Sequence, residues 1–275
     1  MESIAKPNKI NHQAGDKPNQ GIVTIEPFYP GYGMTLGNSL RRVLLSSLPG
    51  AAVTGVKIKG AGHEFATIPH VKEDVLEIIL NLKKLRLKVT GDEDQTLELD
   101  VTGKKEVKAK DIKKNSSVEI VNSDLTLANI TDVGGNLNME ITVSPGRGYK
   151  SVEQKKSDKQ DIGFIEMDAV FSPVISAGIT IENVRVGKMT NWDKLILDIT
   201  TDGSINPKEA FEESVKILVE QFNSLIDLNT EKKSSKSKET DSKKEEKKET
   251  KEKKTEEKKT TAKKNTEKKS TSKKQ

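Results

Sequence analysis

The feature that most constrains the fold of this chain is its C-terminal end, which cannot contribute to a folded core. Residues 231–275 contain 19 Lys, 10 Asp or Glu and a single apolar residue, Ala262. Such a segment buries too little apolar surface to offset the entropy that it would lose on ordering. We therefore predict a Lys-rich disordered tail over residues 230–275 and a folded body made from the residues before it.

The tail also holds the net positive charge of the chain. Removing it from the totals leaves 28 basic and 32 acidic residues in the body. The sequence pI of about 9.0 therefore describes the tail and does not indicate a basic surface on the body. The absence of Cys excludes disulfides and thiolate metal sites and suits a cytoplasmic location. No apolar run approaches the roughly 20 residues that span a bilayer, so we expect no membrane partner.

Hydrophobic periodicity predicts a mixed α+β body. Residues 1–20 are polar and are expected to form a disordered leader, followed by a short strand at 21–27. Helices are predicted over about 36–47, 71–82 and 207–228, from apolar residues that recur every three or four positions. Alternating and β-branched segments predict the remaining strands, at 53–59, 85–90, 97–101, 118–121, 125–128, 137–143, 163–171, 179–186 and 195–200.

The last predicted helix has an apolar seam with coiled-coil spacing. Its members are four, three, four and three residues apart: Phe211, Val215, Leu218, Phe222 and Leu225. Leaving five such side chains in water would forfeit on the order of 10 kcal/mol. The seam could pack on the chain's own sheet or on another subunit, and its periodicity does not decide between the two.

The search for chemistry gives one weak candidate. Gly31, Gly33 and Gly37 lie between a strand and a helix, where a nucleotide phosphate could bind, but the spacing is G-x-G-x-x-x-G and no P-loop lysine follows. A nucleotide-binding enzyme is therefore a minor alternative. The histidines lack metal-ligand spacing, and the carboxylates do not form a recognisable acid–base pair. We expect no metal, no cofactor and no catalytic residue.

Several segments, in order along the chain, match the motifs of one known protein family. The main one, residues 31–50, reads GYGMTLGNSLRRVLLSSLPG. Others are VKEDVLEIILNLK at 71–83, GRGY at 146–149, DAVFSPV at 168–174, DKL at 193–195 and NPKEA at 206–210. Together these segments resemble the RNA polymerase alpha subunit family, and the resemblance covers roughly residues 20–228.

This resemblance implies a fold and a subunit arrangement. The fold is α+β: an antiparallel sheet with two long helices forms a dimerisation subdomain from residues 21–49 and 163–229, and a mostly β subdomain, residues 50–162, is inserted into it. The dimer interface would comprise Tyr32, Leu36, Leu40, Val43, Phe211, Val215, Leu218, Phe222 and Leu225. The homodimer would nucleate assembly of the beta and beta-prime subunits of a DNA-directed RNA polymerase, a nucleotidyltransferase.

The resemblance also implies contact residues and one departure. Arg42, with Leu45 nearby, matches a beta-contacting position, and Lys83 and Val174 match positions implicated in large-subunit contact. Arg41, adjacent to Arg42, is expected to belong to the same contact surface. The usual family member continues into a C-terminal DNA-binding domain, which this sequence is expected to lack. Promoter DNA would then be contacted only through the complex, or weakly through the tail. A protein that binds nucleic acid nonspecifically through this tail is the second alternative.

Overall fold

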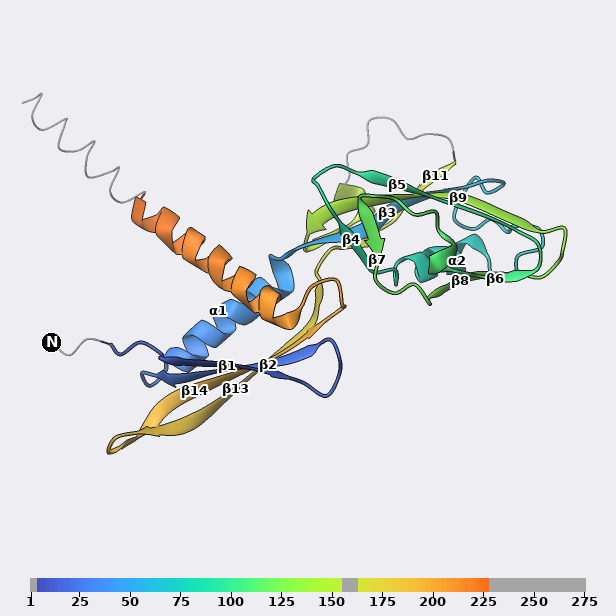
Figure 1. The fold of residues 1–275 in the computed structure, drawn as a ribbon. Helices are drawn as coiled ribbons and strands as arrows, with labels where there is room; N and C mark the ends of the chain where they lie inside the picture. The colour runs from blue at the N-terminus through green and yellow to red at the C-terminus, as the bar shows by residue number, and fades with distance from the viewer. Residues whose placement is uncertain (1–3, 155–162, 228–275) are drawn as a thin grey trace, which may run out of the picture. The chain divides into compact units, whose positions relative to one another are not determined.

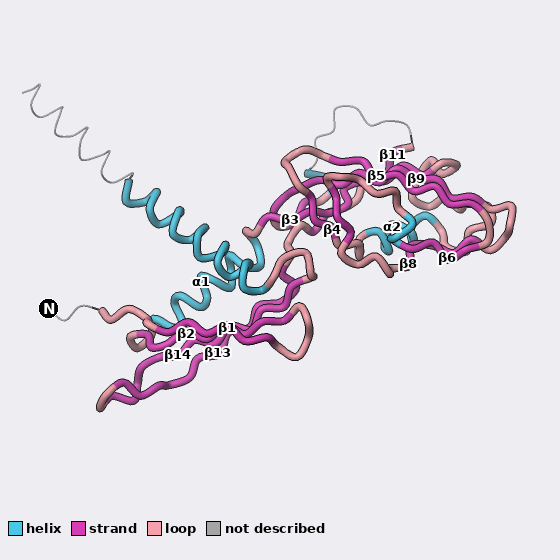
Figure 2. The backbone as a smooth tube through the Cα atoms, in the orientation of Figure 1, coloured by secondary structure: helices cyan, strands magenta, loops and turns pink. Residues whose placement is uncertain are grey.

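The computed structural model of the chain describes residues 4–154 and 163–227. Strands provide most of its regular structure (Figure 2). The predicted tail, residues 230–275, and most of the polar segment before residue 163 lie outside the described residues. No helix within the described part of the chain is long and apolar enough to cross a membrane.

The first sheet has four antiparallel strands in the order β1-β2-β14-β13 (Figure 1). Their bounds are Lys9–Ala14 for β1, Gln20–Phe28 for β2, Val174–Val186 for β13 and Met189–Thr201 for β14. Helix α1, Tyr32–Ser46, lies against β13 and β14. A further helix spans residues 207–227. The buried face of this sheet packs apolar residues of β2 and β14 against Leu40, Leu44 and Phe211.

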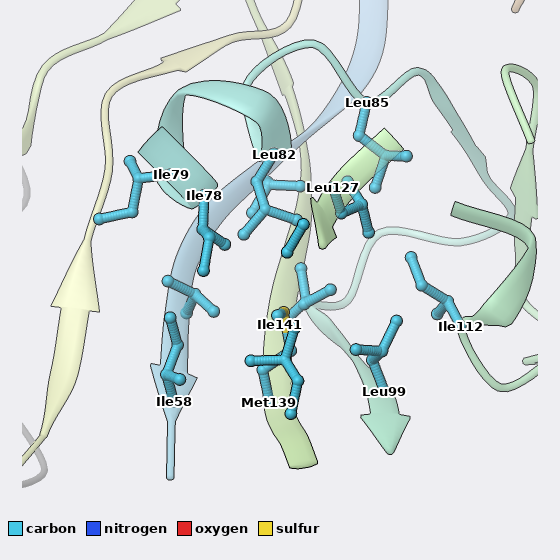
Figure 3. Close-up of a cluster of buried hydrophobic side chains, with 14 of the residues drawn as sticks. Ile58, Ile78, Ile79, Leu82, Leu85, Leu99, Ile112, Leu127, Met139 and Ile141 are labelled. Carbon is cyan, nitrogen blue, oxygen red and sulfur yellow. The ribbon is translucent and has the colours of Figure 1, made fainter. Parts of the chain in front are cut away.

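The second sheet has the strand order β5-β9-β3-β4-β7, and β11 also pairs with β3. The bounds are Pro49–Ile58 for β3, Leu87–Val89 for β4, Gln95–Thr102 for β5, Val118–Ile120 for β7, Asn136–Arg147 for β9 and Phe164–Glu166 for β11. Helix α2, Val75–Leu82, covers it. Figure 3 shows Ile78 and Leu82 of this helix pointing toward Ile141 and Met139 of β9.

Short elements complete the chain. Two two-stranded sheets pair β6 with β8 and β10 with β12. Their strands are Lys105–Lys108 for β6, Thr126–Ile130 for β8, Tyr149–Lys150 for β10 and Ala169–Val170 for β12. Two 3-10 turns span Ala109–Asp111 and Val152–Gln154.

The prediction of a disordered leader is wrong for residues 9–14. They form strand β1, which pairs with β2 from Lys9 opposite Glu26 to Ala14 opposite Gly21. All the side chains of this strand are exposed, so the sequence lacks the alternation of buried apolar and exposed polar residues that would indicate a strand. What holds it is backbone hydrogen bonding together with the ring of His12, which meets the ring of Phe211 edge-on at 5.8 Å.

The predicted return to the first subdomain at residue 163 is also wrong. Strand β11 pairs with β3 in the second sheet, and Met167 lies in the second sheet's core. The first sheet resumes only at Val174, the first residue of β13. Residues 163–171 thus belong with the inserted subdomain. Their alternation fits a strand in either sheet, so the sequence does not specify which sheet they join.

The second helix is shorter than predicted. Val71 precedes it and forms an isolated bridge with Ile130. Asp74 is the N-cap, and its side chain accepts a hydrogen bond of 2.7 Å from the backbone N–H of Glu77. Glu73 lies outside the helix, where its carboxylate accepts two hydrogen bonds from Asn129 at 2.6 and 2.7 Å. The Glu73 carboxylate therefore joins the segment before α2 to strand β8.

Candidate assembly surfaces

The N-terminus of α1 is capped by a carboxylate from a distant strand. Gly31, with a φ of 86°, is the N-cap residue and has no side chain to accept a hydrogen bond. Instead, Asp193 Oδ2 of β14 accepts the backbone N–H groups of Gly31 at 2.8 Å and Gly33 at 3.1 Å. A negative group at a helix N-terminus also interacts favourably with the helix dipole. This buried contact joins α1 to the first sheet.

The same contact excludes the nucleotide-binding alternative. A phosphate cradled by the Gly31–Gly37 turn would need the amide groups that already bind Asp193, and it would meet that carboxylate's charge. A Cβ at Gly33 would lie 2.9 Å from Asp193 Cβ, so the second glycine makes room for an internal cap. Within the residues that the structure describes, no group of three or more His, Cys, Asp or Glu side chains could hold a metal ion.

Gly37 allows α1 to lie close to the sheet beneath it. A Cβ at this position would be 2.8 Å from Leu195 Cδ1 and 3.1 Å from Ile179 Cγ2. A glycine at this position thus permits a close approach of the helix to the sheet. Gly33 and Gly37 therefore mark the sheet-facing side of α1, with Leu40 and Leu44 following on that side.

The seam of the last helix divides into two halves. Phe211 is 6% exposed and lies in the core of the first sheet, and Val215 and Leu218 pack against that core. Phe222 is 57% exposed, and Val219, Leu225 and Ile226 have similar exposure. The interpretation that the seam packs on the chain's own sheet is thus correct for its first half. The second half presents apolar side chains to solvent, and its packing on another subunit stays a prediction.

The predicted interface residues of α1 divide in the same way. Tyr32 and Leu36, one turn apart, are exposed on the helix. Val43 is half-buried. Leu40 is buried in the first sheet's core, so in this structure its side chain offers little surface to another subunit.

The adjacent arginines on α1 differ in their surroundings. Arg41 Nε donates a 3.1 Å hydrogen bond to the backbone carbonyl oxygen of Ala177 on β13, which ties the helix to the sheet. Arg41 and Arg42 are both exposed, at positions roughly 100° apart around the helix. Leu45 is partly buried against the first sheet's core. Arg41 therefore has one of its guanidinium donors bound to the sheet, whereas Arg42 occupies an exposed position on another side of the helix.

Lys83 lies in a small polar cluster beside β10 and β12. Its Nζ is 3.6 Å from Asp168 Oδ2, and the other oxygen of Asp168 accepts a 3.0 Å hydrogen bond from the backbone N–H of Val152. That backbone hydrogen bond, with Lys83 and the Tyr149 hydroxyl, holds the pKa of Asp168 below its ordinary value of 3.8. Burial, together with the negative charge of Asp168, raises the pKa of Tyr149.

Val174 does not belong with this surface. Its side chain is 4% exposed and lies in the core of the first sheet, at the start of β13. A buried side chain has little area to offer, so the contact of Val174 with a large subunit stays a prediction. The sequence could not distinguish the two roles, since a valine at the edge of a strand pattern suits either.

Comparison with known proteins identifies the family of the chain. Residues 56–172 match the model described as "RNA polymerase Rpb3/RpoA insert domain". These residues include most of the second sheet and extend to the point where the first sheet resumes. The match therefore agrees with the boundary that the strand pairing gives.

Three curated relatives are named "DNA-directed RNA polymerase subunit alpha". The protein of Carboxydothermus hydrogenoformans is 49% identical over 229 residues, which cover 83% of this chain and 72% of that protein. Those of Oceanobacillus iheyensis and Macrococcus caseolyticus are 48% and 47% identical, each over 84% of this chain and 73% of the relative. Identity at this level across most of both sequences shows that the chain belongs to the family of DNA-directed RNA polymerase alpha subunits.

Proposed function

We propose that this chain is the scaffold of a cytoplasmic DNA-directed RNA polymerase: it dimerises with a second copy and the dimer then binds the beta and beta-prime subunits. In this proposal the chain supplies surfaces and no catalytic residue, and it needs no cofactor of its own. The large subunits perform the nucleotidyl transfer, and promoter DNA is reached through the assembled complex.

The observation that carries the proposal is the exposed half of the last helix. Val219, Phe222, Leu225 and Ile226 are apolar and each is at least half exposed. Fully burying one such side chain contributes about 1.5–3 kcal/mol, so covering the exposed half of these four would contribute roughly 3–6 kcal/mol per copy. A marginally stable protein leaves that much apolar surface open mainly where another subunit covers it.

The first half of the same helix and helix α1 belong to the first sheet's side of the proposed interface. Phe211 is buried in the core of the first sheet, and Val215 and Leu218 pack against that core. Tyr32 and Leu36 add apolar surface on α1. A two-fold dimer places two copies of each of these surfaces in the interface.

Two copies of one chain can bind two different large subunits, because the dimer presents two copies of every other surface as well. Arg42 is exposed on α1 and has the planar fork that binds carboxylates in two places. Lys83, paired with Asp168, provides a second charged position on the inserted subdomain. Once the first large subunit is bound to one copy, the two copies are no longer equivalent.

A matched pair of variants tests this function. Phe222→Asp places a charge within the proposed interface, whereas Phe65→Asp makes the same change at a side chain 72% exposed on the inserted subdomain. Each full-length variant is co-expressed, tagged, with the beta and beta-prime subunits, and its mass and co-eluting subunits are measured. We expect Phe222→Asp to be monomeric and to lose the large subunits, and Phe65→Asp to retain both.

Two results would contradict the proposal. One is a Phe222→Asp protein with the mass of a dimer and a full complement of large subunits. The other is a wild-type chain that purifies without either large subunit, because that would remove the assembly function whatever its oligomeric state. Circular dichroism of both variants establishes that the monomer, where it forms, is folded.

A further inference from the structure

An exposed aromatic cluster lies beside the N-terminus of α1. The ring of Tyr29 meets the ring of Tyr32 at a centroid distance of 6.1 Å and the ring of Trp192 at 6.0 Å, both edge-to-face. Tyr29 is 47% exposed and Tyr32 is 40% exposed, while Trp192 is half-buried. The three rings come from the residue that follows β2, the start of α1 and strand β14.

This cluster, Tyr29, Tyr32 and Trp192, is held in a fixed arrangement. Trp192 is next to Asp193, whose carboxylate binds the backbone N–H groups on both sides of Tyr32, those of Gly31 and Gly33. The backbone on each side of Tyr32 is therefore hydrogen-bonded. Rigid aromatic side chains lose little conformational entropy on binding, and Tyr and Trp are enriched among the residues that dominate protein–protein affinity.

The surroundings of the cluster are also typical of a protein interface. Residues 27–40 contain no Asp, Glu, Lys or Arg, although 32% of the whole chain is charged. Depletion of charge with enrichment of aromatics and Met distinguishes the centres of protein interfaces from other surfaces. Met34, within this uncharged stretch, is exposed as well. A nucleic acid partner would require a surface rich in Lys and Arg.

We propose that the aromatic cluster is covered by a second copy of this chain and extends the dimer interface onto the end of the first sheet. This inference rests on the proposed function, in which Tyr32 and Leu36 already contact the second copy. Tyr32 cannot be covered without its neighbours being approached, since Tyr29 touches it and Trp192 touches Tyr29. Because residues 27–40 contain no charged side chain, this segment brings no like charges into a contact between two copies.

Trp192 provides a direct measurement, because it is the only Trp in the chain. Its emission and its quenching by acrylamide are recorded for the full-length wild-type dimer and for the Phe222→Asp monomer, whose substitution lies outside the cluster. We expect a lower quenching constant and a shorter emission wavelength in the dimer. The same measurements on a Trp192→Phe variant give the part of the emission that comes from the tyrosines.

A second arm measures the contribution of the cluster to affinity. Tyr29→Ala is expected to raise the dimer dissociation constant about tenfold, which corresponds to about 1.4 kcal/mol, whereas Phe65→Ala on the inserted subdomain is expected to leave it unchanged. Analytical ultracentrifugation over a dilution series gives both constants. This arm does not depend on Phe222→Asp being monomeric.

The outcomes separate this inference from the proposed function. Equal quenching in a wild-type dimer and a Phe222→Asp monomer overturns the aromatic contact and leaves the scaffold intact, as does an unchanged constant for Tyr29→Ala. Quenching that falls only when the large subunits are added assigns the cluster to them and also overturns the inference. A wild-type chain that is monomeric overturns the inference and the dimer together.

Discussion

Replacing Asp193 with Ala should destabilise the first sheet far more than a single surface substitution normally does. The carboxylate is buried, and its Oδ2 accepts two backbone N–H groups, from Gly31 at 2.8 Å and Gly33 at 3.1 Å. Both donors belong to the first turn of α1, which has no other side-chain cap. The substitution would therefore leave two amide groups without an acceptor at a site that water reaches poorly.

The expected magnitude follows from these two bonds. Loss of an ordinary N-cap costs about 0.5–2 kcal/mol, and a hydrogen bond to a charged group contributes about 1.5–3 kcal/mol. Two bonds to one buried oxygen, with some rehydration of the amides, should cost about 2–4 kcal/mol. Asp193→Asn keeps an acceptor oxygen but loses the charge, so it should cost less, about 1–2 kcal/mol.

The assay is urea unfolding of the full chain followed by circular dichroism, with the midpoint shift converted through an unchanged m-value. Asp198→Ala is the matched control. It also removes an aspartate carboxylate from β14, but the Asp198 carboxylate accepts its hydrogen bonds from the side-chain amide of Gln20, at 2.9 and 3.0 Å. We expect that control to cost less than about 1 kcal/mol, because the Gln20 amide can turn to water. Equal costs for Asp193→Ala and Asp198→Ala would refute the capping argument.

Three further predictions concern other parts of the described chain. Gly37→Val should destabilise the first sheet by about 1–3 kcal/mol, because the valine side chain would push against Leu195 and displace α1 from the sheet. A urea midpoint equal to that of the wild type would contradict this close approach. Arg42→Ala should leave the dimer mass unchanged and weaken binding of the beta subunit by about 1.5–3 kcal/mol. Titration of the purified subunits measures this loss, and unaltered binding would show that Arg42 is not part of the contact. Because the pKa of Asp168 is lower in the folded state, its ionised carboxylate stabilises the fold above pH 3.8, and this contribution is lost as the pH falls through the lower, folded pKa. The urea midpoint of the wild type should therefore exceed that of Asp168→Asn by an amount that shrinks on acidification below about pH 4. An advantage that is constant across this range would show that the Asp168 charge plays no part.

How far the sequence predicts this protein is clearest in the last helix. The spacing from Phe211 to Leu225 correctly predicts one apolar stripe, and the structure has a helix over residues 207–227. The spacing is the same in both halves, so it carries no information on where the sheet beneath the stripe ends. That depends on strands β2 and β14, which are distant in sequence, and only the structure separates buried Phe211 from exposed Phe222.

Long-range contacts account for the other differences. Asp193 caps α1 from 160 residues away, and no local pattern connects a carboxylate in a strand with a glycine turn. Strand β1 has polar, exposed side chains, so its pairing with β2 depends on backbone groups that every sequence has. The inserted subdomain was easier to predict, because the apolar alternation of β5 and β9 is strict and gives both the strands and their buried faces.

The central claim is that two copies of this chain associate through exposed apolar helix surfaces, and light scattering coupled to size-exclusion chromatography tests it most directly. The full-length wild-type chain, at micromolar concentration and without any other subunit, should elute as a single species with twice the chain mass of 30.3 kDa. A folded species that keeps a mass of 30.3 kDa over the same concentrations would contradict the claim.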